Sequence, residues 1–147
     1  MKRFKYSLET VLDYKNQVLD NLKQEHAEIT RSVNEKREEI HHLERTMDDY
    51  QTEFDETKSA GVPIESFRLY NICIERMGKI IEEEKEHLVF LEEKQEKKKI
   101  EVVEAKVDTS KFEKLKGKKL QEYRKAELKE EEAFAEETAV RMMSAER

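Results

Sequence analysis

Apolar residues recur at alternating steps of four and three along the first part of the chain, and this repeat constrains the fold more than any other sequence feature. A 3.5-residue period sustained over so many residues is the signature of a coiled coil. Lys15, His26 and Lys36 occupy the places where the repeat skips. Its members are Leu8, Leu12, Leu19, Leu22, Ile29, Val33, Ile40, Leu43, Met47, Tyr50 and Phe54. The pattern predicts one helix over residues 7–58, about 78 Å long.

The residues before this helix are basic and aromatic, "MKRFKY". They do not form a secretory signal, because Glu9 and Asp13 interrupt any apolar run of roughly 7–15 residues. A mitochondrial presequence would lack acidic residues, so that interpretation also fails. Ser7 instead suits an N-cap, and Glu9 places a carboxylate in the first turn, where the helix dipole favours it. The stretch is therefore interpreted as the start of a structural element.

The composition fits a rod better than a compact globule. Of the 147 residues, 44% are charged and 36% apolar, with three glycines and one proline. The length predicts a single domain over residues 1–147. No stretch approaches the roughly 18 apolar residues of a membrane span. One cysteine, Cys73, excludes an internal disulfide framework and fits a reducing compartment. A net charge of −6 argues against nucleic acid as a partner.

The stretch "SAGVPIESF" is the one clear break in the pattern. Gly61 can end the first helix in the left-handed conformation, and Pro63 suits the first turn of the next, so a turn over residues 59–63 is expected. A second apolar ladder predicts a helix over residues 64–140, with a kink or fraying near 108–117, where "VDTSK" forms helix poorly. Its members are Phe67, Tyr70, Ile74, Met77, Ile81, Leu88, Leu91, Val102, Ala105 and Phe112.

Two long helices joined by a short turn pack antiparallel. The predicted fold is therefore all-α, an antiparallel two-helix coiled-coil hairpin with an overhanging C-terminal helix from about Gly117. With the tip near Val62, facing residues have numbers that add to about 124. Lys36 and Glu84 then fall one turn apart, and we expect them to meet and to fix the register of the hairpin.

Charge is uneven along this predicted hairpin. Residues 94–119 hold ten lysines and five acids, and residues 1–6 add three basic groups. Antiparallel pairing brings these segments together at the open end. Solvated charged faces are one interpretation. The alternative is a basic end that contacts an acidic or polar cavity.

No catalytic, metal or cofactor site is predicted. Three Glu-x-x-His spacings occur, but a di-iron bundle needs such pairs facing inward from several helices. These pairs flank the seam or lie past it, and a two-helix hairpin offers no dry pocket for chemistry. The three spacings are Glu38–His41, Glu39–His42 and Glu84–His87.

One apolar feature exceeds what a two-helix seam needs. Leu69, Ile72, Cys73 and Ile80 add apolar surface beside the seam of the second helix. A slightly wider core near the turn is one interpretation. A docking patch for another protein is the other, since a contiguous exposed apolar strip marks an interface.

The chain resembles the flagellar type III export protein FliJ family over essentially its whole length. The opening "FKYSLETVLDYKNQ", the middle "SAGVPIESFRLYNICIERMGKII" and the end "FEKLKGKKLQEYRKAELKEEEAFAEETA" carry the resemblance. It implies a non-enzymatic central stalk that inserts into a hexameric export ATPase and promotes its assembly and activity. It also implies contacts with the cytoplasmic domain of the export-gate membrane protein and with export chaperones. The expected location is cytoplasmic, peripheral at the inner face of the membrane through these partners.

The resemblance also implies two surfaces. Together with the apolar strip, it indicates an export-gate docking surface of Leu69, Tyr70, Ile72, Cys73, Met77, Ile80 and Glu84. By analogy with a rotary stalk, the ATPase ring would be contacted by Arg3, Lys5, Lys114, Lys116, Lys118 and Lys119. Two alternatives remain open: the equivalent stalk of a virulence type III secretion system, and a purely structural coiled coil that dimerises through its seam.

Overall fold

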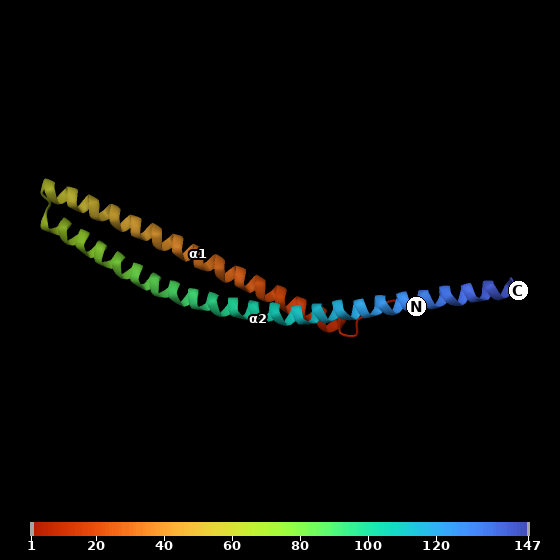
Figure 1. The fold of residues 1–147 in the computed structure, drawn as a ribbon. Coiled ribbons are helices and arrows are strands. Elements are labelled where there is room, and N and C mark those ends of the chain that lie inside the picture. The colour runs from red at the N-terminus through yellow and green to blue at the C-terminus, as the bar shows by residue number, and fades with distance from the viewer. Residues whose placement is uncertain (1, 147) are drawn as a thin grey trace. The chain divides into compact units, whose positions relative to one another are not determined.

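The computed structural model describes residues 2–146, and in them two α-helices account for almost the whole chain (Figure 1). Helix α1 runs over Glu9–Ala60 and α2 over Ile64–Ala145, with no strand among the described residues. The two helices are packed against each other, which confirms the predicted all-α helical hairpin. Helix α1 begins and ends two residues later than the repeat suggested, and α2 continues five residues further.

The chain reverses over residues 61–63. Gly61 has φ of 83°, the left-handed conformation that a residue without a Cβ adopts readily, and its N–H donates to the carbonyl of Lys58 at 3.4 Å. The carbonyl of Pro63 accepts the N–H of Phe67 at 3.1 Å, which starts α2 directly after the turn. Sequence signals in "SAGVPIESF" therefore place the turn within two residues.

Two compact units share the helices. The turn unit comprises Leu22–Val102, and the terminal unit comprises Met1–Asn21 with Val103–Arg147. Both helices are continuous at the residues where the units meet. A single domain over residues 1–147 stays a prediction.

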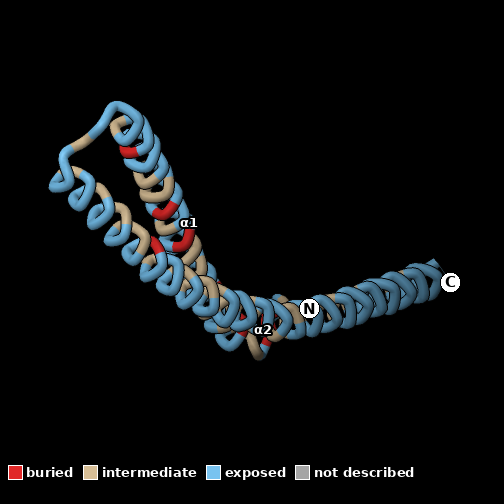
Figure 2. The backbone as a smooth tube through the Cα atoms, turned by 90° about the vertical axis from the view of Figure 1, so that its left-hand side faces the viewer, coloured by how far each residue is buried: buried red, intermediate tan, exposed pale blue. Residues whose placement is uncertain are grey.

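In the turn unit, the core is a narrow seam between the two helices (Figure 2). Val33 is fully buried, and Ile40, Phe54 and Ile81 are each about 6% exposed. On α1 the deepest positions, Val33, Ile40 and Phe54, are spaced in multiples of seven, as the 3.5-residue period requires. The flanks are closed by ion pairs across the two helices: Arg37–Glu92 at 3.2 Å, Lys85–Glu44 at 3.0 Å and Lys98–Glu25 at 2.9 Å.

Lys36 and Glu84, the pair expected to set the register, lie together in this seam. Lys36 Nζ donates to Glu84 Oε2 at 2.5 Å and to Glu39 Oε2 at 3.0 Å. The Lys36 side chain is only 16% exposed, so moving either helix by one turn would leave its charge partly buried without Glu84. The pair therefore opposes slippage of the two helices.

The stability of the hairpin should depend on pH through this lysine. The carboxylates of Glu84 and then Glu39 hold the pKa of Lys36 above its ordinary value of 10.5. Because the pKa of Lys36 is raised on folding, its ion pairing contributes to the free energy of unfolding. This contribution is complete below 10.5 and is lost as the pH rises through the pKa of Lys36 in the folded protein. We expect the unfolding free energy of the wild type, relative to Lys36→Met, to stay constant from neutral pH up to about 10.5 and to fall above that point. Urea unfolding of both proteins across this range measures it, and a parallel pH profile would contradict it.

In the terminal unit, the segment before α1 packs on α2. Tyr6 is 8% exposed, and its hydroxyl donates to the carbonyl of Phe112 at 3.2 Å. The Tyr123 hydroxyl donates to the carbonyl of Lys2 at 2.5 Å, and the rings of Phe4 and Tyr123 lie 5.5 Å apart. Residues 2–8 therefore form a strap along α2, and the same unit contains the buried seam residues Leu12 and Leu19.

Residues 108–117 are helical throughout, so the fraying considered for this stretch is not present. Tertiary contacts outweigh the weak helix propensity of "VDTSK". Thr109 is 3% exposed and donates back to the carbonyl of Ala105 at 2.8 Å, while Lys15 Nζ lies 2.6 Å from Asp108 Oδ2. Lys116 forms a second ion pair, with Glu9 at 2.8 Å.

Candidate protein-binding surfaces

The apolar strip on α2 is exposed in the turn unit. Leu69 and Ile72 are more than half exposed, and Cys73 and Ile80 are exposed as well. These four residues lie on one side of α2, because steps of three, four and seven residues return a helix to nearly the same angle. Arg76 interrupts the strip at its middle. The wider-core interpretation therefore does not account for these side chains.

A shallow hollow of about 230 Å³ adjoins the strip near the turn. Leu69, Tyr70 and Cys73 line it from α2, and Tyr50 lines it from α1. Because both helices contribute, the hollow requires the hairpin to be closed. Its mainly apolar lining suits an inserted apolar side chain of a partner.

The other residues assigned to this surface face the hairpin instead. Tyr70 packs on Phe54 with ring centroids 5.3 Å apart, and Met77 is half-buried. Glu84 is held by Lys36 in the seam. A partner would therefore meet Leu69, Ile72, Cys73 and Ile80, with Tyr70 at the edge of the hollow.

Sequence reasoning missed some exposed apolar residues of α2, and Val89 and Phe90 are the clearest example because they are adjacent. Val89 and Phe90 are more than half exposed further along α2. They were overlooked because they follow the seam residue Leu88 directly and continue its apolar run. A count of apolar residues outside the 3.5-residue repeat would have found them. Gly78, also in this region, is not needed for close packing, since an added Cβ would lie 3.7 Å from Met47 Cε.

The six cations assigned to ring contact all lie in the terminal unit. Arg3, Lys5, Lys114 and Lys118 are exposed, and Lys119 lies 3.7 Å from Glu122. Lys116 is occupied by its ion pair with Glu9. An open groove of about 690 Å³ runs between the strap and α2, lined by Lys2, Arg3, Phe4, Lys5, Tyr6, Ser7, Lys119, Glu122 and Tyr123. The strap thus adds cations and aromatic rings to the basic part of α2.

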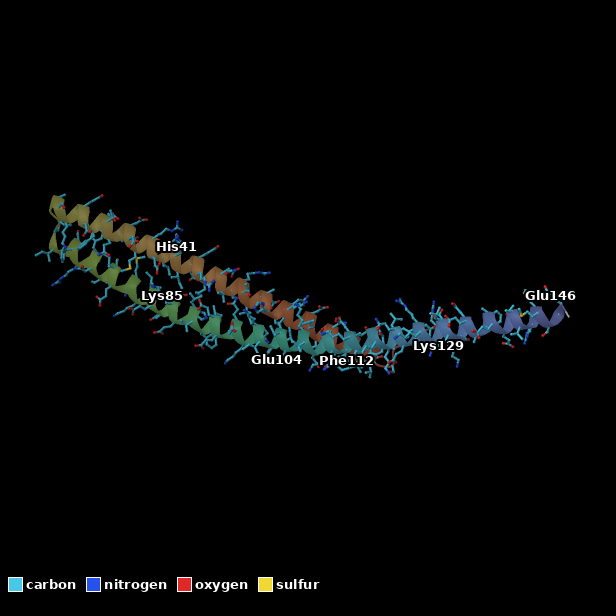
Figure 3. All side chains as sticks on the ribbon, in the orientation of Figure 1. His41, Lys85, Glu104, Phe112, Lys129 and Glu146 are labelled. Carbon is cyan, nitrogen blue, oxygen red and sulfur yellow. The ribbon has the colours of Figure 1, made fainter. Side chains whose placement is uncertain are left out.

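Neither metal binding nor a membrane span is supported within residues 2–146. No group of three or more His, Cys, Asp or Glu side chains there is arranged to hold a metal ion. His41 and His42 are both exposed on α1, where Figure 3 labels His41. Over the same described residues, neither helix has a stretch apolar enough to cross a bilayer.

The geometry defines a helical-hairpin coiled-coil protein with an exposed apolar strip and a basic groove. The family model described as flagellar FliJ protein matches residues 4–147, essentially the whole chain, so the chain belongs to the FliJ family. It is therefore a component of flagellar type III protein export. The FliJ family is not known for catalysis. Searches of the curated proteins and of the solved structures found no match to this chain.

Proposed function

We propose that this protein is the central stalk of the flagellar export ATPase, which it enters with its basic end and whose ring assembly and hydrolysis it promotes. The family match over residues 4–147 carries the proposal. The antiparallel hairpin supports it, because a stalk must be long, narrow and internally paired to enter a ring of six subunits. The clustering of Arg3, Lys5, Lys114, Lys118 and Lys119 in one unit supports the choice of the basic end.

In this role the basic end acts by electrostatic complementarity. Exposed cations steer association with an acidic or polar cavity and fix orientation more than they add affinity. Long lysine side chains let several ring subunits be contacted in turn without one rigid fit. The stalk itself performs no chemistry; it changes which ring conformation is favoured by binding that conformation better.

The apolar strip gives the second contact. Leu69, Ile72, Cys73 and Ile80, with the hollow beside them, would dock on the cytoplasmic domain of the export-gate protein. This contact would place the protein peripherally at the inner face of the membrane. Export chaperones are further proposed partners, for which no surface is assigned.

The decisive experiment measures hydrolysis and hexamer content of the partner export ATPase with and without this protein. We expect both to rise, and we expect Lys114→Glu combined with Lys118→Glu and Lys119→Glu to reduce the rise, because an acidic end is repelled by the cavity. The matched control is Lys23→Glu with Arg31→Glu and Arg45→Glu, three exposed cations of the turn unit that lie outside the basic segment 94–119. No stimulation by the wild type would reject the stalk; equal stimulation by the two triple variants would reject the basic end.

A further inference from the structure

Among the described residues, the last part of α2 has no second helix beside it. Thr138 and Arg141 bond only to residues four positions earlier in the same helix. Figure 3 shows Lys129 and Glu146 on a stretch of α2 with no second helix beside it. Five large apolar side chains there are more than half exposed: Leu128, Phe134, Val140, Met142 and Met143. A single helix of this length is marginal in water unless its apolar face is covered.

Two adjacent blocks of opposite charge lie on this part of α2. Residues 111–125 hold seven cations and two acids, whereas residues 127–137 hold six glutamates and one lysine. Lys2, Arg3 and Lys5 of the strap add to the basic block. The two blocks follow each other along one continuous helix, which keeps them apart within a chain. A second copy of the chain carries the complement of both.

We propose that two copies of this protein associate through an antiparallel contact of their α2 helices, with the two-fold axis near Ala126 and Glu127. This arrangement sets residues 119–123 of each copy against 130–134 of the other, so both charge pairings form twice. A two-fold contact of this kind closes on itself and stops at a dimer. The seam residues stay buried inside each hairpin. This dimer therefore differs from one in which two chains pair through their seam residues.

The apolar side chains fit the same arrangement. Tyr123, Glu127 and Phe134 share one face of α2, because seven and eleven residues return a helix to nearly the same angle. Phe134 of one copy therefore reaches the level of Lys119 in the other. There the groove offers the rings of Phe4 and Tyr123, 5.5 Å apart, and the aliphatic stem of Lys119. The occupant of the groove is thus the acidic, Phe134-bearing stretch of the second copy.

The dimer is expected to be weak. Two single helices that overlap over about 20 residues bury less area than the roughly 1,000 Å² of a stable interface. Because exposed charges supply much of the contact, salt should weaken it.

The test is sedimentation equilibrium of the full-length protein over a range of concentrations. The mass should rise from 17.6 kDa toward twice that value, and more salt should reduce the rise. One variant combines Arg3→Glu, Lys5→Glu and Lys119→Glu; the other combines Glu131→Lys, Glu132→Lys and Glu136→Lys. Each variant alone should associate at least about tenfold more weakly than the wild type, because like charges then face each other. An equimolar mixture of the two should associate again, since opposite charges face each other in both halves.

The control is Glu82→Lys with Glu83→Lys and Glu86→Lys, three exposed residues of the turn unit, which should dimerise like the wild type. Circular dichroism shows whether each variant keeps its helices. A monomer mass at every concentration, or a mixture that fails to associate, would overturn the proposal. This test does not include the export ATPase. The proposed dimer can therefore be rejected while the stalk function is retained, and the stalk function can be rejected while the dimer is retained.

Discussion

Phe54→Ala is expected to lower the free energy of unfolding by about 3 kcal/mol or more, because truncation of a buried phenylalanine removes its burial and leaves a cavity. Phe54 is 6% exposed near the turn, with the rings of Phe67 and Tyr70 5.2 and 5.3 Å away. The ammonium of Lys58 lies 4.9 Å from the Phe54 centroid. Each aromatic pair adds about 0.5–1.5 kcal/mol beyond its burial. In a core one seam wide, no second layer compensates for this loss.

Urea unfolding followed by circular dichroism measures this change, and amide hydrogen exchange locates it. Exchange should accelerate most in the residues around the turn. Tyr14→Ala is the matched control, since Tyr14 is 64% exposed on the same helix and its removal should shift stability by about 0.5 kcal/mol at most. If the Phe54→Ala protein were as stable as the Tyr14→Ala protein, the aromatic contacts of Phe54 with Phe67 and Tyr70 would not be what holds the hairpin together near the turn.

The second large effect concerns the apolar strip. Ile80→Asp and Cys73→Asp should each weaken binding to the cytoplasmic domain of the export-gate protein by about 30-fold or more, as expected for the centre of an apolar interface. Both positions are exposed, so the charge meets water in the free protein and an apolar surface only in the complex. The unfolding midpoint should therefore stay near that of the wild type.

Isothermal titration of the gate domain with each variant measures the affinity. Val107→Asp is the control: Val107 is 53% exposed on the same helix, but it belongs to the terminal unit. Its affinity should equal that of the wild type. Unchanged affinity for Ile80→Asp and Cys73→Asp would rule out the strip as the docking site without affecting the proposed contact with the ring.

Periodicity predicted the parts of the fold that repeat. Leu12, Leu19, Val33, Ile40 and Phe54 are buried because they share one phase of the 3.5-residue period. The turn was predictable because glycine with positive φ followed closely by proline leaves few other conformations. Lys36 and Glu84 could be paired from residue numbers alone, since two antiparallel helices have only one register variable.

The strap could not be predicted in this way. Residues 2–8 do not repeat, and their contacts with Phe112 and Tyr123 connect segments more than 100 residues apart. The helix over residues 64–140 was predicted, but fraying near 108–117 was considered because local propensity is weak there, and the stabilising contacts with Lys15 and Glu9 come from the other helix. The sequence could only partly separate the predicted docking residues from the seam. Tyr70, Met77 and Glu84 lie among the strip residues in the sequence, but in the structure they face the seam.

The spacing of the buried residues of α1 also determines how hairpins of this kind can differ in length. Removing one residue from α1 alone would turn every later side chain by about 100° and expose the seam. Inserting seven residues in each helix, at facing positions, would preserve every pairing on both sides of the insertion. Each helix would then be about 10 Å longer. Helix length in this architecture can therefore change only by whole heptads, and each such change needs matched insertions or deletions at two places that lie far apart in the sequence.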